Sequence, residues 1–138
     1  MIGTKKLISV FSLFVAGQML TSISATTNSP NADYTIDMQG TINTCAGVFA
    51  DAGDTNGDYA DGENYIITFC SDAQNQISFT FKHFNTETGS DILTIYDGAD
   101  NSATNLGIFC TNSPNLVTSS GTCLHFEFYS DDEILISN

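Results

Sequence analysis

Residues Cys123 to Ser130 read CLHFEFYS, in which apolar and polar side chains alternate. Successive side chains of a β-strand point to opposite faces, so the apolar members of this run share one face. They are Leu124, Phe126 and Phe128. The run therefore predicts a strand that buries this apolar face in a core.

Similar alternation recurs along the chain, between turns that are rich in Gly, Asn, Asp and Ser. The further runs are Asn64–Cys70, Gln76–Phe84 and Asp91–Gly98, with weaker ones at Leu106–Cys110 and Asn115–Ser119. No segment has a sustained helical period. This pattern predicts an all-β, antiparallel fold, either a sandwich or a barrel. Its core would be rich in aromatic rings, because the 138 residues include 10 Phe and 5 Tyr.

The first 25 residues have the layout of a secretory signal peptide. Lys5 and Lys6 precede the apolar run Leu7–Gly17, and small residues follow it. The run is too short, and wrongly flanked, for a membrane-spanning helix. A buried N-terminal helix is the alternative interpretation, but nothing after the run has helical period. We therefore expect an exported protein that is secreted or held at the cell surface.

Cleavage after Ser24 and cleavage after Ala25 are both compatible with this layout. The segment Thr26–Asp33 lacks apolar periodicity and predicts a flexible lead-in, with a first strand ending near residue 40. Residues 41–138 would then form a single domain.

The charge is strongly acidic, with a formal net charge of −13 for the whole chain. Without the first 25 residues only Lys82 opposes the sixteen acids, and the net charge becomes −15. Such a surface repels nucleic acid and anionic lipid, and it suits cations and basic partners. Solubility after export is an equally good explanation of the acidity.

Four cysteines in an exported chain predict disulfides, and four cysteines allow three pairings. Bonds between neighbouring strands favour the sequential pairing, Cys45 with Cys70 and Cys110 with Cys123. A zinc site is the rival interpretation, but the spacing of these cysteines does not match the usual zinc motifs.

Two acids bracket a tight connection in the stretch ETGSDILTIYDG, Glu87 to Gly98. Glu87 and Asp91 therefore project from one end of the sheet. If each later strand reverses direction, Asp131 emerges at that same end. Three converging carboxylates repel one another unless a cation or protons join them, and Ca²⁺ prefers such oxygen ligands. The alternative is that each acid is an ordinary solvated turn residue.

A second acidic segment, Asp54–Glu63, resembles the start of an EF-hand loop. Tyr59 occupies the sixth position, where the sharp turn demands Gly, so a surface loop is the better interpretation. Enzymatic activity is not expected. His83 and His125 lie in predicted strands outside any catalytic motif, and the sequence has no phosphate-binding loop.

Five segments, in this order, resemble the CUB domain family, in particular the type carried by exported and surface proteins of bacteria. They are CAGVF (45–49), DYADGENYIITFC (58–70), ETGSDILTIYDG (87–98), GIFC (107–110) and CLHFEFYSD (123–131). The resemblance implies a jelly-roll-like β-sandwich with two sequential disulfides. It also implies that Glu87, Asp91 and Asp131 are calcium ligands.

The chain departs from the family pattern in two places. Only three residues separate Glu87 from Asp91, whereas vertebrate members have a longer loop there, so details of coordination can differ. After Asp131 the family usually continues into a closing strand. Here Ile134–Ile136 would form a truncated last strand, or the chain is a fragment of a longer protein.

The sequence thus predicts an exported, non-catalytic binding or adhesion module that is stabilised by calcium. The resemblance implies contact with a Lys or Arg group of a protein partner, through carboxylates of the calcium site. A carbohydrate-binding module that uses exposed Tyr faces is one alternative, and an accessory domain of an exported hydrolase or protease is another. Neither nucleic-acid binding nor insertion into a membrane after signal cleavage is expected.

Overall fold

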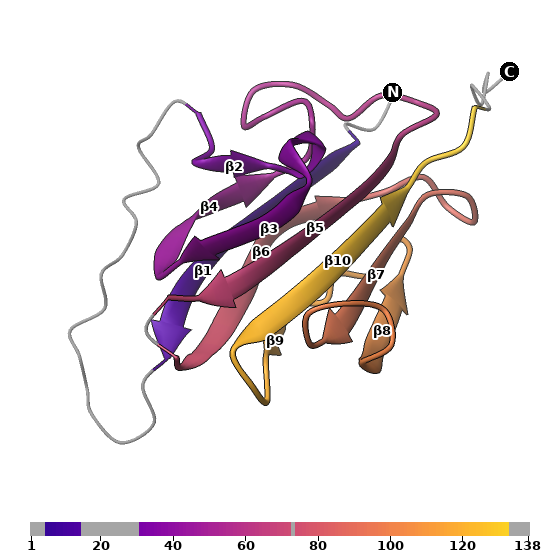
Figure 1. Ribbon diagram of the computed structural model, residues 1–138. Helices are drawn as coiled ribbons and strands as arrows, with labels where there is room; N and C mark the ends of the chain where they lie inside the picture. The colour runs from indigo at the N-terminus through magenta and orange to yellow at the C-terminus, as the bar shows by residue number, and fades with distance from the viewer. Residues whose placement is uncertain (1–4, 15–30, 73, 133–138) are drawn as a thin grey trace, which may run out of the picture.

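The computed structural model describes residues 5–14, 31–72 and 74–132, which form two packed five-stranded β-sheets (Figure 1). Sheet A has the strand order β2-β4-β1-β6-β9, and sheet B has the order β3-β5-β10-β7-β8. The strands of sheet A are β1 (Lys6–Phe14), β2 (Tyr34–Thr35), β4 (Ala46–Ala50), β6 (Gln76–Asn85) and β9 (Leu116–Thr118). Those of sheet B are β3 (Gly40–Thr44), β5 (Asn64–Ser71), β7 (Ile92–Asp97), β8 (Thr104–Phe109) and β10 (Cys123–Tyr129).

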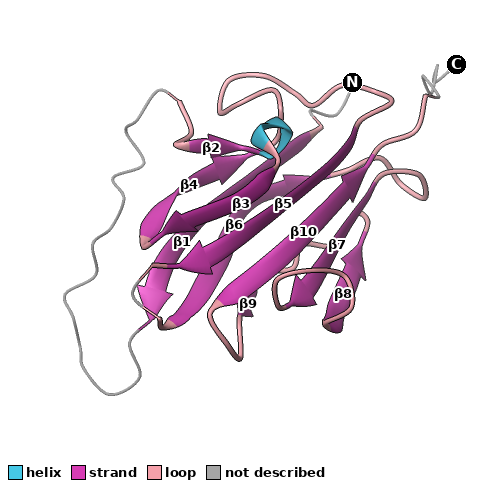
Figure 2. Cartoon of the chain, viewed as in Figure 1, coloured by secondary structure: helices cyan, strands magenta, loops and turns pink. Residues whose placement is uncertain are grey.

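The predicted all-β fold is confirmed. The described residues contain one short 3-10 helix, Ile36–Met38, and otherwise strands and loops (Figure 2). Each predicted run lies on an observed strand, with bounds that agree to within about two residues. In the part of the chain that is described, no helix has the length and apolar character needed to cross a membrane.

Strand β10 lies in the middle of sheet B, antiparallel to β5 on one side and to β7 on the other. Its predicted apolar face is confirmed, because Leu124, Phe126 and Phe128 are all 0% exposed. Phe126 packs against three other phenylalanines, with ring centroids 4.8–6.0 Å apart. They are Phe49, Phe69 and Phe79, and they join the two sheets through tilted and edge-to-face contacts.

The predicted antiparallel arrangement is only partly right, since both sheets are mixed. Strand β2 pairs parallel with β4, and β3 pairs parallel with β5. Strands β2 to β5 alternate between the two sheets. An intervening strand in the opposite sheet returns the chain to its starting end, so two successive strands of one sheet run in the same direction.

The largest departure from the sequence analysis is strand β1. It lies between β4 and β6 and pairs antiparallel with both (Figure 1). We assigned these residues to a signal peptide and predicted no strand among them. Removal of residues 1–25 stays a prediction, but in the chain that retains them Lys6–Phe14 is an interior strand of sheet A. Of the predicted lead-in, residues 26–30 lie outside the described residues. Asp33 at its end exchanges hydrogen bonds with the backbone of Val48.

The predicted pairing of the cysteines is wrong. The structure joins Cys70 to Cys123, which face each other across β5 and β10, and leaves Cys45 and Cys110 as free thiols. Register across β7 places Cys110 level with the end of β10, about six residues or roughly 20 Å from Cys123 along the strand direction. Cys110 and Cys123 therefore lie toward opposite ends of sheet B, whereas the pairing of β10 with β5 brings Cys123 to Cys70.

Phe126→Ala should lower the free energy of unfolding by about 3–5 kcal/mol, because it leaves a cavity among three packed rings. Chemical denaturation followed by fluorescence or circular dichroism measures this loss. Tyr129→Ala is the matched control, since Tyr129 lies on the same strand but is 50% exposed, and it should cost less than about 1 kcal/mol. An unchanged denaturation midpoint for Phe126→Ala would contradict the core assignment.

Cys123→Ser should lower the free energy of unfolding by about 2–4 kcal/mol, because the bond closes a loop between residues 53 positions apart. Cys45→Ser, which removes an exposed free thiol, should change it by no more than about 0.5 kcal/mol. Peptide mapping without reduction should recover a peptide pair that contains Cys70 and Cys123. Recovery of Cys45 joined to Cys70 instead would show that the observed pairing is not the one formed in solution.

Candidate cation site

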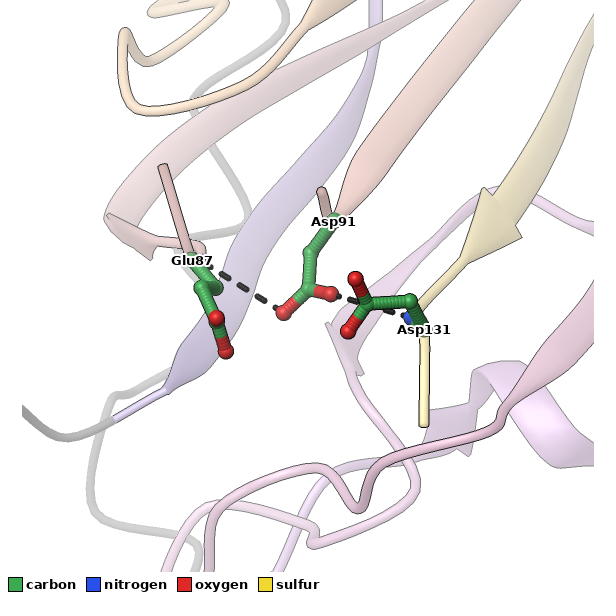
Figure 3. A group of neighbouring side chains, drawn as sticks. All are labelled: Glu87, Asp91 and Asp131. Carbon is green, nitrogen blue, oxygen red and sulfur yellow. Dashed lines mark hydrogen bonds between the residues drawn. The ribbon is translucent and has the colours of Figure 1, made fainter. Parts of the chain in front are cut away.

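The carboxylates of Glu87, Asp91 and Asp131 meet at one end of the sandwich (Figure 3). One oxygen from each lies within 4.8 Å of the others. Glu87 belongs to the connection between β6 and β7, Asp91 immediately precedes β7, and Asp131 follows β10. Since β7 and β10 are antiparallel neighbours, the start of β7 and the end of β10 lie at the same end of sheet B.

Asp91 organises this cluster. It is 0% exposed, and its carboxylate accepts a hydrogen bond from the Tyr59 hydroxyl at 2.5 Å. The backbone N–H of Asp131 donates to its Oδ1 at 3.3 Å, and that of Glu87 donates to its Oδ2 at 3.4 Å. In Figure 3 the Asp91 carboxylate lies between the other two residues. A buried carboxylate with these donors is held in place, and it fixes the positions of its two neighbours.

Glu87 supplies a buried acceptor that has no hydrogen-bond partner. Its side chain is 7% exposed, and Oε1 is buried without a donor. The turn that presents it contains Gly89 with φ +88°, a conformation that favours glycine. Leaving a buried carboxylate oxygen unpaired is costly, and a bound cation would remove that cost.

The position of Asp131 depends on Ser130. The Ser130 hydroxyl accepts from the backbone N–H of Glu63 at 2.8 Å and donates to the carbonyl of Ala60 at 2.9 Å. The Asp131 carbonyl in turn accepts from the N–H of Gly62 at 2.7 Å. The end of β10 is thus tied to the loop that precedes β5.

That loop is the acidic segment we set aside as a surface loop, and it contributes two residues to the site. Tyr59 is 3% exposed, with its ring 4.9 Å from that of Phe128. Burial and the hydrogen bond to Asp91 raise the pKa of Tyr59 well above its usual value, so it stays a donor. Asp61 borders the site from the same loop. In the sequence, the feature that could have indicated a site residue in this loop is the aromatic side chain of Tyr59 among acidic residues and glycines.

Lys5 is the third residue that the sequence analysis did not place at the site. Its Nζ lies 2.5 Å from Asp61 Oδ1, 3.0 Å from Glu87 Oε2 and 3.9 Å from Asp91 Oδ2. The ammonium also lies 5.7 Å from the centroid of the Tyr59 ring. Burial acts to lower the pKa of Lys5, but hydrogen bonds to Asp61 and Glu87 raise it above its usual value.

The two histidines lie elsewhere. The His125 ring is buried, with Nδ1 2.7 Å from the Thr68 hydroxyl and Nε2 3.3 Å from Glu127. His125 is near the start of β10, whereas the carboxylates gather at its other end. His83 is exposed on β6.

The donor set of the site fits a hard divalent cation. Its three carboxylates come from two segments that are distant in the sequence, their oxygens are already close together, and one buried oxygen lacks a donor. Ca²⁺ takes six to eight oxygen ligands with flexible geometry, which such carboxylates, backbone carbonyls and water can supply. The chemistry available is therefore cation binding and the capture of positively charged groups.

Comparison with known proteins agrees with the fold. Residues 40–137 match the CUB domain model. The chain is also similar to the zinc metalloproteinase nas-39 of Caenorhabditis elegans, with 34% identity over 97 residues. That alignment covers 63% of this chain and 10% of the relative, so the chain spans about a tenth of the length of the curated relative it matches.

CUB domains are generally non-catalytic binding modules, are typically extracellular and often bind calcium. The likeness to a bacterial type in particular has no support in these comparisons and stays a prediction. The matched region contains all five strands of sheet B and all three clustered carboxylates. The chain therefore belongs to the CUB domain family.

Proposed function

We propose that this chain is an exported, non-catalytic binding module that holds Ca²⁺ between Glu87, Asp91 and Asp131 and uses that end of the sandwich to contact a basic group on a protein partner. The observation that carries the proposal is the convergence, within 4.8 Å, of three carboxylates from two segments that are distant in the sequence. Membership of a family of binding modules supports the general function.

Calcium would stabilise the site by joining segments that the core does not hold directly. The connection between β6 and β7 carries Glu87, and the segment after β10 carries Asp131. Both segments lie at one end of the sandwich and bring negative charge toward the buried Asp91. A divalent cation offsets this repulsion and cross-links the two segments in the folded state.

The contacts of Lys5 support the proposal of a basic partner. The Lys5 ammonium contacts Asp61 and Glu87, so the carboxylates at this edge can accept an ammonium group. Charge-assisted hydrogen bonds of this kind are stronger than neutral ones when partly desolvated. The formal net charge of −13 would also speed the approach of a basic partner.

A glycan-binding module is the second candidate, and one observation favours it. Tyr129 is 50% exposed and could offer a ring face to a sugar. Binding of this kind would not depend on Asp131 or on calcium, which separates it from the main proposal. A role as an accessory domain of an exported protease is suggested by the metalloproteinase relative, of which this chain matches a tenth.

Calcium should raise the melting temperature of the protein, and Asp131→Asn should abolish that rise. Binding to the folded state alone adds RT ln(1 + [Ca²⁺]/Kd), about 2.7 kcal/mol at a hundredfold excess over Kd. Asp131→Asn is preferred to a change at Asp91, because Asp91 is fully buried and holds the Tyr59 hydroxyl. Differential scanning calorimetry in calcium and in chelator measures the increment for each protein.

Asp72→Asn is the matched control. Asp72 is exposed and follows β5 at the opposite end of sheet B, so the variant loses the same charge far from the site. It should keep the whole calcium increment. If the original protein shows no calcium-dependent rise, or if Asp131→Asn retains all of it, the three acids do not form a calcium site.

A further inference from the structure

The connection between β7 and β8, residues 98–103, folds back over the outer face of sheet B (Figure 1), and we call it the strap. The Ala99 carbonyl accepts a hydrogen bond from the Thr68 hydroxyl of β5 at 3.3 Å. The Asn101 side-chain amide donates to Glu127 Oε1 of β10 at 3.1 Å. The strap joins β7 to β8 but is held by side chains of β5 and β10, so it reaches across the sheet.

His125 lies between the two side chains that hold the strap. It pairs in register with Thr68, and the next residue of its strand, Phe126, is buried in the core. His125 therefore points to the outer face of sheet B, yet it is only 6% exposed. Its Nδ1 lies 2.7 Å from the Thr68 hydroxyl, and its Nε2 lies 3.3 Å from Glu127 Oε1. The strap accounts for this burial, because it bonds both hydrogen-bond partners of the ring.

The hydrogen bonds around the His125 ring require a proton on each of its nitrogens. The Thr68 hydroxyl has one proton to donate. When that proton goes to the Ala99 carbonyl, the contact between Thr68 and Nδ1 needs a proton on Nδ1. An ionised carboxylate only accepts, so the contact between Nε2 and Glu127 needs a proton on Nε2. Only the imidazolium form makes all three hydrogen bonds at once.

The neutral ring has one proton too few for this network. With its proton on Nδ1, the bare Nε2 would face the Glu127 carboxylate without a hydrogen bond. With its proton on Nε2, that contact is kept, and Nδ1 accepts from Thr68, which can then no longer donate to Ala99. The second arrangement gives up only the longer Thr68 contact, 3.3 Å against 2.7 Å, so it costs less. Loss of the proton therefore releases the strap from β5.

The charged groups that face His125 come from β10 and from the strap. Glu127 is the acid on β10. Asp100 is the acid on the strap, and hydrogen bonds from Ser102 lower the pKa of its carboxyl, with the charge of His125 acting in the same direction. Strand β7 contributes Tyr96, whose ring centroid lies 5.8 Å from that of the imidazole, and β5 contributes only an uncharged hydroxyl. Histidine is the side chain whose charge ordinarily changes between about pH 5 and about pH 8.

We propose that protonation of His125 controls the strap: the imidazolium holds residues 98–103 against sheet B, and the neutral ring releases them from Thr68. An open strap would uncover His125, Thr68 and Tyr96 on the outer face of sheet B. These three residues lie in one row across the strands, at the end of the sheet opposite the carboxylate cluster. A second surface of the module would thus become accessible as the pH rises.

NMR of the full-length protein in chelator, from about pH 5 to about pH 8, tests this proposal over the range in which histidines ordinarily titrate. The ring C–H signals report the protonation of His125. The heteronuclear ¹⁵N NOE of the strap amides reports their mobility. This NOE should fall as the pH rises, with the same midpoint as the His125 ring signals. The amides of β10 should keep a constant NOE, because that strand is paired on both sides.

Three variants assign the response to its cause. His125→Gln carries no titratable ring, so its strap should lose the pH response. His83→Gln is the matched control, since it makes the same substitution at an exposed histidine of β6, and it should keep the response. Thr68→Val removes the hydroxyl and keeps the shape of the side chain. Its strap should be mobile at every pH, while the His125 ring still titrates.

A strap NOE that stays constant while His125 titrates would overturn the proposal, and so would a His125 ring that keeps one protonation state throughout. A full response in His125→Gln, or its loss in His83→Gln, would also overturn it. A strap that becomes more mobile at low pH would contradict the direction of the control. These outcomes leave the calcium site untouched, because the contacts of the strap with β5 and β10 involve none of its three carboxylates.

Discussion

The position of β10 between β5 and β7 is the constraint on which most of this structure depends. The strand supplies the apolar face of the core, with Phe126 at its centre. At its start, Cys123 is bonded to Cys70 on one neighbour. At its end, the backbone N–H of Asp131 donates to Asp91, which is buried at the start of the other neighbour. Core, cross-link and candidate site are therefore set by one strand and its register.

How much could be predicted from the sequence differs from feature to feature. The face of Leu124 and Phe126 followed from alternation alone, and strand direction brought Asp131 to the same end as Asp91. The prediction of the disulfides was wrong because it did not take strand direction into account. Reversal of successive strands already places Cys110 at the site end and Cys123 at the other. Pairing by adjacency in the sequence ignored this separation.

Tyr59 and Lys5 were missed for different physical reasons. Tyr59 lies in a loop whose composition indicates solvent exposure, and only the tertiary fold brings its ring against Phe128 and its hydroxyl against Asp91. Lys5 belongs to a segment whose charge and apolar run suit an export signal. A composition of this kind also suits an interior strand, because an export signal and an interior strand each need a continuous apolar stretch. No local pattern connects Lys5 with acids more than fifty residues away.

The interior position of β1 also bears on what sheet A would be without it. The order β2-β4-β1-β6-β9 leaves two pairs, β2-β4 and β6-β9, when β1 is taken away. The backbone donors and acceptors of β4 and β6 that face β1 would then line two opposed open edges, one strand width apart. Open edges of this kind are templates for pairing with another strand. A chain that loses its first residues would therefore need a replacement strand, from elsewhere in the same protein or from a second molecule, to close its sheet.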